Sequence, residues 1–338
     1  LPYRPFSRIL KNLSPADLRE MISYSLSEGF PELRRQVSLR TVGRMGGVGA
    51  DDIIITNGCT EAVALAIMAA SRAGGTIAVE SPTNFGFLQL LHELGMLVLE
   101  IPADPRYGVD LAVLERAIDR SRIDACLMVP NFHNPLGALM PDEHKRQLVQ
   151  LTNAHGIPVI EDDISAELYF NGHRPLPLRA FDEKDLVVTC SSFSKTLAPG
   201  LRIGYAVTGK RFREKIQNLK AATTVSTSTL DQYLIACYLE GGAYERHLRQ
   251  LRGELKKQVF RTALAVQQHF PPETRLAVPG GGTLLWVQLP PQVDGMQVYR
   301  NALDARIAVI PGGLCSNSGQ FTNFIQISCG APFTQEVE

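Results

Sequence analysis

The chain of 338 residues is 45% hydrophobic, and 34 Lys and Arg side chains balance 34 Asp and Glu side chains. This composition is typical of a globular protein with a sizeable core, and the neutral charge argues against the chain itself following a nucleic-acid backbone. The longest apolar run, 62–70, is about half of what a membrane-spanning helix needs, and no signal peptide opens the chain. Six scattered cysteines without a C-x-x-C pair favour reduced thiols and a cytoplasmic location.

Short apolar strands alternate with helical stretches along much of the chain. The predicted strands are 53–56, 76–80, 97–101, 125–129, 158–160, 186–190 and 203–207. The predicted helices include 61–72, 84–94, 111–121 and 142–155, each with apolar residues at helical spacing. This alternation predicts an α/β fold in which helices cover one wide, mostly parallel, seven-stranded sheet.

The character of the sequence changes after about residue 229. A long helical tract from 231 towards 270, a Pro-Gly break at 279–282 and a strand at 284–289 predict a smaller α+β C-terminal domain. We therefore divide the chain into an N-terminal arm (1–35), a large domain (36–229) and a small domain (230–338). The chain opens with Leu1, and 332–338 has the pattern of a first helical turn, so we expect both ends to be cut.

The stretch Ser191-Ser192-Phe193-Ser194-Lys195 lies just past the predicted strand 186–190, and Arg202 follows seven residues after the lysine. A lysine flanked by hydroxyls can form a Schiff base with an aldehyde cofactor while its neighbours and an arginine bind a phosphate. This combination suggests pyridoxal 5′-phosphate. A solvated lysine in a serine-rich turn is the alternative, but ligands of open α/β sheets bind at the carboxyl ends of strands.

Two other strand ends carry groups suited to the same cofactor. After the first strand, Thr56-Asn57-Gly58-Cys59-Thr60-Glu61 leads into a helix whose first amides can bind a phosphate, although many ligand-free junctions are built this way. Past the strand 125–129, Asn134 can donate to a phenolic oxygen. An Asx turn before Pro135 is the alternative for Asn134.

Three acids in succession, Glu161-Asp162-Asp163, end an apolar strand, where charge is costly without a partner. A carboxylate beside a pyridine nitrogen keeps that nitrogen protonated. We choose Asp162 for this role because it follows the apolar Val159-Ile160 step with only Glu161 between. Metal binding is the rival interpretation, but no histidine or further acid at ligand spacing supports it, and we predict no metal site.

Taken in this order, the motifs resemble the fold-type I pyridoxal-phosphate enzymes of the aminotransferase class I/II family over essentially the whole chain. The likeness is greatest to the aminotransferase-like domain of MocR-type regulators in the GntR superfamily, where that domain follows an N-terminal winged helix that binds DNA. The strings that carry it are ESPT (80–83), VPNFHNPLGALM (129–140), PLRAFD (177–182) and SFSKTLAPGLRIG (192–204).

The resemblance implies roles by matching position. Lys195 would be the Schiff-base lysine, Asp162 the partner of the pyridine nitrogen and Asn134 the contact to the phenolic oxygen. The residues that would surround the phosphate are Gly58, Cys59, Thr60, Ser192, Ser194 and Arg202. Tyr24 matches a tyrosine that reaches a phosphate across a dimer interface, so 1–35 would be a dimer segment and 36–229 the cofactor-binding domain of a homodimer.

Three positions depart from the family pattern. Asn84 stands where an aromatic usually stacks on the cofactor ring, and we expect the adjacent Phe85 to replace it. Ser165 stands where a tyrosine usually supplies a phenol. Gln326 stands where an arginine usually binds the substrate α-carboxylate, and a neutral amide binds a carboxylate much less strongly than a guanidinium does.

The sequence therefore predicts a domain that binds pyridoxal 5′-phosphate and senses an amine or amino-acid ligand in a MocR-type regulator, with weak transaminase chemistry. DNA would be contacted only through a winged helix upstream of these residues. A free-standing amino-acid aminotransferase is the alternative. A cofactor-free structural relic is a third hypothesis, which the joint presence of Lys195, Asp162, Asn134 and Arg202 disfavours.

Overall fold

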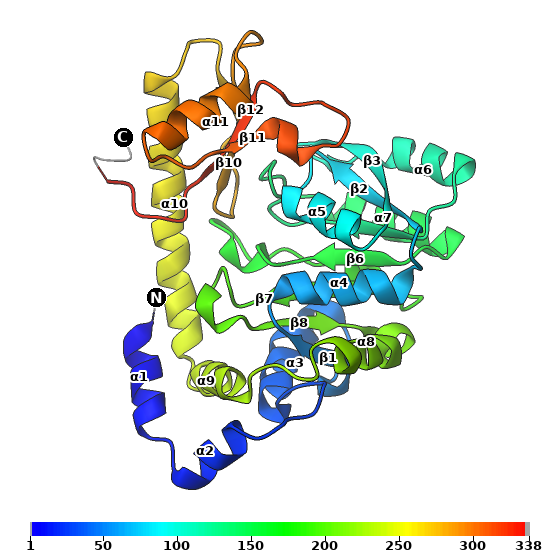
Figure 1. The fold of residues 1–338 in the computed structure, drawn as a ribbon, viewed down its shortest axis with the longest axis vertical. Helices are drawn as coiled ribbons and strands as arrows, with labels where there is room; N and C mark the ends of the chain where they lie inside the picture. The colour runs from blue at the N-terminus through cyan, green and yellow to red at the C-terminus, as the bar shows by residue number, and fades with distance from the viewer. Residues whose placement is uncertain (1, 335–338) are drawn as a thin grey trace.

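The structure is a computed structural model that describes residues 2–334, and within them an eight-stranded sheet forms the centre of the molecule (Figure 1). Its strand order is β1-β8-β7-β6-β5-β2-β3-β4. The strands are β1 (Ile53–Thr56), β2 (Thr76–Ser81), β3 (Leu97–Asp104), β4 (Gly108–Val109), β5 (Ala125–Met128), β6 (Val159–Asp162), β7 (Val187–Ser192) and β8 (Gly204–Val207). All seven predicted strands form, and β4 is too short for a hydrophobic pattern to reveal.

The directions of the strands bring separate chain segments to one edge of this sheet. Strands β3, β2, β5, β6 and β7 are parallel, whereas β8 runs antiparallel to both β7 and β1. Gly204, the first residue of β8, therefore pairs with Thr56 at the end of β1 and with Ser192 at the end of β7. Strand β6 ends beside them, at Asp162.

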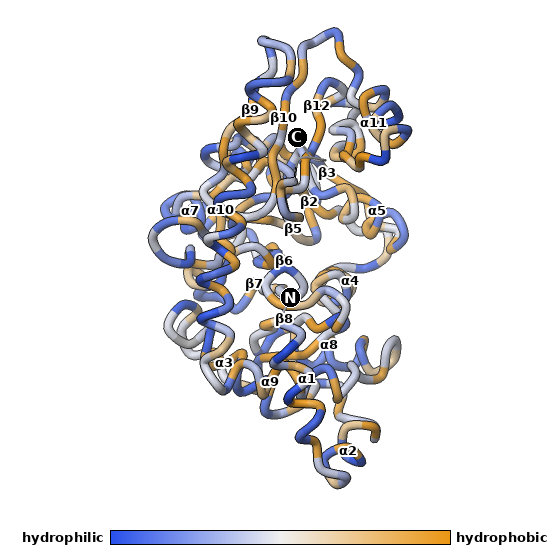
Figure 2. Tube along the Cα trace, turned by 90° about the vertical axis from the view of Figure 1, so that its left-hand side faces the viewer, coloured by the Kyte–Doolittle hydropathy of each residue, from blue (hydrophilic) through white to orange (hydrophobic). Residues whose placement is uncertain are grey.

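Helices cover both faces of the large sheet. They are α4 (Cys59–Ala70), α5 (Phe85–Glu93), α6 (Leu111–Arg120), α7 (Asp142–His155) and α8 (Gly209–Thr223). Helices α4, α5 and α8 pack on the face that includes Ile77 and Val79, and α6 and α7 pack on the face that includes Ala78. Because successive strand residues point to opposite faces, the central strands β5, β6 and β7 are buried on both sides, whereas β3 is largely half-buried or exposed. Figure 2 shows apolar residues concentrated in the strands and α4.

The N-terminal helices pack near the β1 edge of the sheet, together with a helix from later in the chain (Figure 1). They are α1 (Tyr3–Lys11), α2 (Pro15–Met21), α3 (Pro31–Met45) and α9 (Thr229–Glu240). Gly29 precedes α3 with φ +102°, and a Cβ there would lie 2.6 Å from the Ile55 side chain, so only glycine fits. The next amide, Phe30 N, donates to Gln232 Oε1 on α9 at 2.7 Å.

A second, antiparallel sheet of order β11-β12-β10-β9 forms the C-terminal part of the molecule. Its elements are α10 (Ala243–His269), β9 (Arg275–Leu276), β10 (Leu284–Gln288), α11 (Gly295–Asp304), β11 (Ile310–Pro311) and β12 (Phe324–Ser328). The helical tract predicted from 231 to 270 is two helices, because Gly242, with φ 64°, separates α9 from α10.

The predicted helical turn at 332–338 is absent where it is described, since 332–334 are irregular, and 335–338 lie outside the described residues. Within residues 2–334, no helix combines the length and the apolarity needed to cross a membrane.

Candidate active site

The turn from β1 into α4 packs tightly against the start of β8. Gly58 has φ +82°, and a Cβ there would lie 2.4 Å from Arg202 Nη2. A Cβ at Gly204 would lie 2.4 Å from the carbonyl carbon of Gly58. Both positions therefore require glycine, and the guanidinium of Arg202 lies directly against the turn.

Hydrogen-bond donors converge beside this turn. Helix α4 begins at Cys59, its N-cap glycine supplies no side-chain acceptor, and Thr60 is exposed. The first amides of the helix and its positive dipole end are thus available to an anion. Across the turn, Arg202 Nη1 lies 3.4 Å from Ser194 Oγ, and Ser194 N donates to Ser192 Oγ at 3.1 Å. These groups fit a phosphate, which needs positive charge and several donors.

Lys195 lies on the turn that follows β7, and its side chain is exposed. Buried neighbours anchor this turn on both sides of the lysine. Leu197 N donates to Phe193 O at 2.8 Å, and the buried Thr196 Oγ1 accepts a hydrogen bond from Tyr244 Oη at 2.8 Å. The backbone is therefore fixed while Nζ remains accessible to a carbonyl group.

Asp162 is 7% exposed, and its carboxylate contacts neutral donors. Oδ1 accepts from Ile164 N at 3.0 Å and from Cys59 Sγ at 3.4 Å, which joins the end of β6 to the start of α4. Burial raises the pKa of Asp162 to about 6, and these two hydrogen bonds partly offset that effect. A protonated ring nitrogen would supply the positive charge that this carboxylate lacks.

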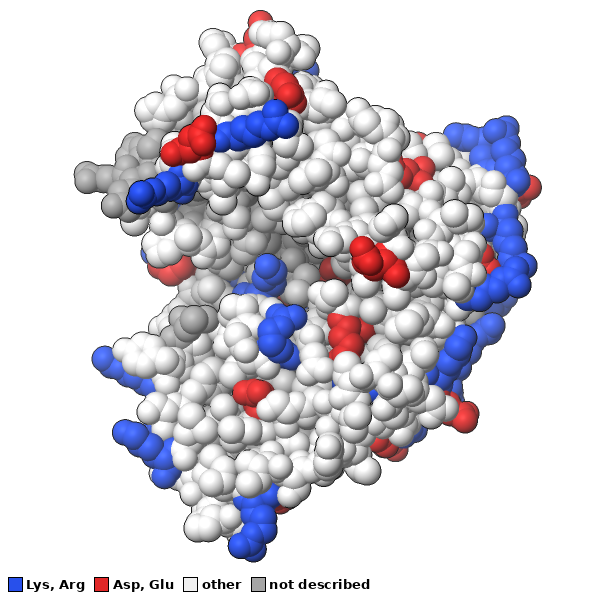
Figure 3. Space-filling model, in the orientation of Figure 1, with Lys and Arg blue, Asp and Glu red and all other residues white. Residues whose placement is uncertain are grey.

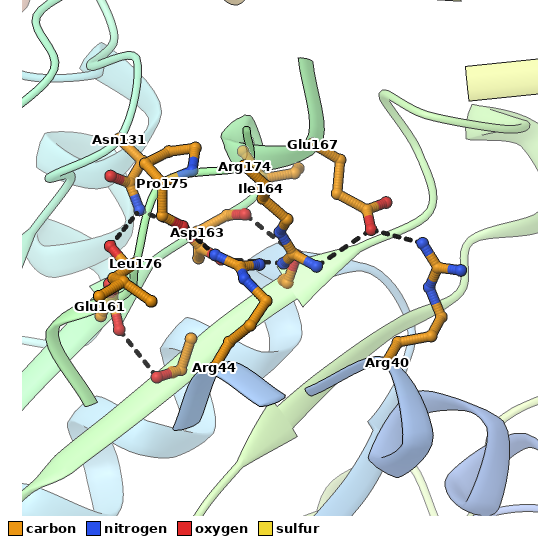
Figure 4. A network of polar contacts seen from close by, with 12 residues as sticks. Arg40, Arg44, Asn131, Glu161, Asp163, Ile164, Glu167, Arg174, Pro175 and Leu176 are labelled. Atoms are coloured by element: carbon orange, nitrogen blue, oxygen red, sulfur yellow. Dashed lines mark hydrogen bonds and ion pairs between the residues drawn. The ribbon is translucent and has the colours of Figure 1, made fainter. Parts of the chain in front are cut away.

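Asp163 belongs to a buried ionic network behind this strand end (Figure 4). Its carboxylate lies 3.2 Å from Arg174 Nη2 and accepts from Asn131 Nδ2 at 2.7 Å. Glu167 continues the network, with Arg174 at 3.0 Å and Arg40 at 2.7 Å. The network fixes the backbone beyond β6 and occupies Asp163, so this acid is not free for a ligand.

Glu161, on the other side of Asp162, is also occupied. It accepts from Leu178 N at 2.7 Å and from Thr189 Oγ1 at 2.8 Å, and burial raises its pKa to about 8. Of the three successive acids, only Asp162 has a hydrogen bond to the turn 57–60, which leads from β1 into α4 and is called the phosphate turn below. Among residues 2–334, no group of three or more His, Cys, Asp and Glu side chains is placed to hold a metal ion.

Asn134 lies in a tight loop after β5. Gly137 N donates to His133 O at 2.7 Å and His133 N to Ala138 O at 2.9 Å, which closes the loop around the asparagine. Within the described residues, Asn134 Oδ1 is buried without a hydrogen-bond partner. Buried amide atoms are rarely unpaired, so this acceptor marks a place where a donor of a ligand can complete the hydrogen bonding, and Nδ2 of the same amide is the atom that can donate to a ligand oxygen.

A buried pair that the sequence predictions missed supports the same loop. His133 Nε2 lies 3.2 Å from Glu80 Oε2, and both side chains are about 1% exposed. Glu80 also accepts from Val129 N at 2.7 Å, which ties the end of β2 to the chain after β5. The available signal was the presence of Glu80 and His133 in two of the family-like strings, but nothing in the sequence paired them.

Local structure explains one departure from the family pattern. Asn84 Oδ1 accepts from Gly86 N at 3.1 Å and so caps α5. Phe85, the first residue of that helix, is 39% exposed, which leaves its ring available to a ligand. Ser165 is half-buried in the turn after β6.

Gln326 lies on β12 of the small sheet, directly opposite Trp286 on β10. Directly opposed residues share a sheet face, and Trp286 packs against Leu136 and Cys315, which places Gln326 on the face towards the Asn134 loop. The side chain is 5% exposed, and within the described residues its Oε1 has no partner. Figure 3 shows the surface hollowed between the small sheet and the large one, with basic side chains inside the hollow.

Tyr24 is not joined to these groups within the single chain. It lies between α2 and α3 and is 93% exposed. A role for Tyr24 in phosphate binding therefore depends on a second copy of the chain.

Comparison with known proteins defines the class. Residues 5–337 match the family model of aminotransferase class I and II, and the chain belongs to this family. It is 36% identical over 332 residues to the uncharacterized HTH-type transcriptional regulator YjiR of Escherichia coli (strain K12), covering 98% of this chain and 70% of that protein. The predicted likeness to regulators of this type is confirmed.

Enzymes are similar to the chain as well. The 2-aminoadipate transaminase of Thermus thermophilus is 30% identical over 311 residues, covering 91% of this chain and 76% of that protein. The crystal structure of the α-aminoadipate aminotransferase LysN from Thermus thermophilus, complexed with N-(5′-phosphopyridoxyl)-L-leucine, superposes with a TM-score of 0.90 at 28% identity and covers 98% of this chain and 84% of that one. The predictions of a fold-type I architecture and of pyridoxal 5′-phosphate as the cofactor are confirmed.

Proposed function

We propose that this chain is the sensor domain of a MocR-type transcriptional regulator, which binds pyridoxal 5′-phosphate and reacts with an amine ligand more readily than it completes transamination. One observation carries the proposal: three features converge at neighbouring strand ends. They are the turn at Gly58 with Arg202 packed against it (the Arg202–Gly58 cradle), the buried Asp162 and the exposed Lys195. Packing alone does not require an arginine against a glycine turn, a buried acid without a cation and an exposed lysine at one site.

Each side chain has a distinct role. When bound, the cofactor supplies an aldehyde carbon to an amine and a protonated ring that accepts electron density from the bonds that break. Arg202 and the first amides of α4 hold its phosphate. Asp162 keeps the proton on the ring nitrogen, and Asn134 donates to the phenolic oxygen. Lys195 Nζ would condense with the aldehyde carbon with loss of water, and as a free amine it would move a proton as a general base.

The regulatory part of the proposal is supported by the likeness to YjiR, whose name describes an HTH-type regulator. DNA contact would come from a winged helix outside these residues, in a cytoplasmic homodimer in which Tyr24 reaches the partner's phosphate. In this arrangement, a ligand that reacts with the cofactor at Lys195 would change the contact between the two subunits of the dimer. That dimer would present the DNA-binding segments.

An amino-acid aminotransferase is the second candidate, and the 30% identity to a 2-aminoadipate transaminase favours it. Gln326 disfavours it, because losing one bidentate charge-assisted contact to an α-carboxylate costs on the order of 2–3 kcal/mol, or roughly a hundredfold in affinity.

The substitution Gln326→Arg separates the two candidates. We expect the wild-type protein to react slowly with α-amino acids, and the variant to react faster or at lower concentration, by up to about a hundredfold, because a guanidinium then meets the carboxylate. Single-turnover absorbance changes of the bound cofactor with L-glutamate and L-2-aminoadipate measure this.

Gln326→Met is the matched control, since it keeps the side-chain length without a charge and should show no gain. The site is 5% exposed, so unfolding curves of both variants are needed to establish that each is folded. Fast multiple turnover by the wild-type protein, with no gain in Gln326→Arg, would identify an aminotransferase that holds the carboxylate elsewhere.

A further inference from the structure

Lys220, on α8, is a fully buried lysine that the reaction does not use. Its Nζ lies 3.2 Å from Glu61 Oε2 and 3.4 Å from Glu61 Oε1. It also donates to Thr224 Oγ1 at 3.2 Å and to Thr227 Oγ1 at 3.1 Å. The ammonium group therefore has a complete set of partners, and one of them belongs to the first turn of α4.

Glu61 connects this lysine to the phosphate turn. Its carboxylate accepts a hydrogen bond from the backbone amide of Asn57, the residue directly after β1, and another from Thr224 Oγ1. Asn57 O in turn lies 3.5 Å from Arg202 Nη2. Contacts thus run without a gap from Lys220 through Glu61 and Asn57 to the guanidinium of Arg202.

Burying this lysine is unfavourable by itself. Burial lowers the pKa of Lys220, and the neighbouring Glu61 opposes that effect. A buried ion pair seldom stabilises a fold more than an apolar pair of similar volume, whereas removal of one partner leaves an uncompensated charge. A role in positioning the turn gives a reason for a charged pair at this place.

We propose that Lys220 and Glu61 are positioning residues that hold the turn 57–60 in the shape that receives the cofactor phosphate, without touching the phosphate themselves. The inference rests on the proposed binding of pyridoxal 5′-phosphate. Glu61 fixes Asn57 N, which orients the backbone that leads into Gly58 and the first amides of α4. Lys220 fixes the Glu61 carboxylate. Loss of either side chain should therefore weaken recognition of the phosphate and leave the contacts to the ring intact.

The test compares dissociation constants for pyridoxal 5′-phosphate and for pyridoxal, which lacks the phosphate. In Lys220→Met and in Glu61→Gln, we expect affinity for pyridoxal 5′-phosphate to fall roughly tenfold and affinity for pyridoxal to change less than about twofold. Because Lys220→Met removes a buried charge and can impair folding, the nearly isosteric Glu61→Gln provides the independent second measurement.

Lys145→Met is the matched control. Lys145 is also fully buried and is paired with Asp142 at 3.2 Å, but it lies on α7, on the opposite face of the sheet from α4 and α8. Its loss should lower stability and preserve the preference for the phosphorylated compound. If Lys220→Met and Glu61→Gln both bind pyridoxal 5′-phosphate in preference to pyridoxal as strongly as wild type does, this inference is wrong and the proposed function stands. If the wild-type protein itself does not prefer pyridoxal 5′-phosphate to pyridoxal, the proposed function is wrong as well.

Discussion

The three successive acids at the end of β6, Glu161, Asp162 and Asp163, differ in the groups that they contact. Asp163 is paired with Arg174, and Glu161 accepts from the amide of Leu178 and the hydroxyl of Thr189. Asp162 accepts from an amide and from the thiol of Cys59, at the start of α4. The pKa of Asp162 rises from 3.8 to about 6 because burial penalises its charge. This shift corresponds to about 3 kcal/mol of cost when the carboxylate ionises in the cofactor-free fold.

The pH dependence of stability follows from this shift. Because the folded pKa of Asp162 lies above the unfolded value, the folded state binds more protons between about pH 4 and pH 6, and its stability falls as pH rises through that window. We expect the cofactor-free Asp162→Asn variant to be more stable than wild type at pH 7.5, by on the order of 1–3 kcal/mol, and the gap to close towards pH 4. Denaturant unfolding at several pH values measures it.

Asp163→Asn is the control for that experiment. It removes one of the two carboxylate partners of the buried Arg174 and should destabilise the protein at pH 7.5. An Asp162→Asn variant less stable than wild type at pH 7.5 would mean that the carboxylate has a stabilising partner in the fold.

In the proposed function, phosphate binding depends on the junction of β1, α4 and β8. Its geometry rests on two glycines and on Arg202, whose own φ of 52° lies in the left-handed region. A backbone conformation in this region is energetically unfavourable, and it persists where ligand binding or close packing of two chain segments requires it.

Gly58→Ala tests this junction against a second glycine. Gly74 has a similar φ of +77° but open space where its Cβ would lie, whereas the Cβ of Gly58→Ala would meet Arg202. Both substitutions should lower the free energy of unfolding, by about 1 kcal/mol from backbone strain. Only Gly58→Ala should weaken the binding of pyridoxal 5′-phosphate, as measured by titration of the cofactor absorbance. Equal affinities of Gly58→Ala and Gly74→Ala would contradict the role given to the cradle.

Sequence patterns predicted the elements of the large sheet because its strands are short runs of apolar residues, and the central ones are buried on both faces. They missed β4, which has only two residues, and the break between α9 and α10 at Gly242, since periodicity continues on both sides of it. They located the groups at strand ends, because strand order and direction bring those ends together. They did not find the Lys220–Glu61 and His133–Glu80 pairs, since partners 159 residues apart in the first case leave no local signal. The division at residues 35 and 229 stays a prediction.

At the scale of the whole molecule, the small sheet faces the site through Gln326, and the N-terminal segments lie at the far edge of the large sheet (Figure 1). Tyr24 is exposed within one chain, so a site completed by this tyrosine needs a homodimer. A shared site would let a ligand at one subunit alter the contact between both.

Tyr24→Phe tests this arrangement. Loss of one hydrogen bond to a charged phosphate should weaken the binding of pyridoxal 5′-phosphate roughly tenfold, while sedimentation should still show a dimer. Tyr3→Phe, which alters another exposed tyrosine, 68% accessible on α1, should bind the cofactor as wild type does. If the wild-type protein is a monomer and binds the cofactor with full affinity, the proposed role of Tyr24 in the site is wrong.

The proposed function depends above all on Lys195, which would bond the cofactor in a site assembled at four strand ends, those of β1, β5, β6 and β7. The most direct measurement is reduction of the protein with borohydride in the presence of pyridoxal 5′-phosphate, followed by peptide mapping by mass spectrometry. We expect one phosphopyridoxyl group per chain, on Lys195, and none on the buried Lys145 and Lys220. The variant Lys195→Ala should carry no label and still bind the cofactor weakly through Arg202. A label on another lysine, or no label on the wild-type chain, would contradict the account.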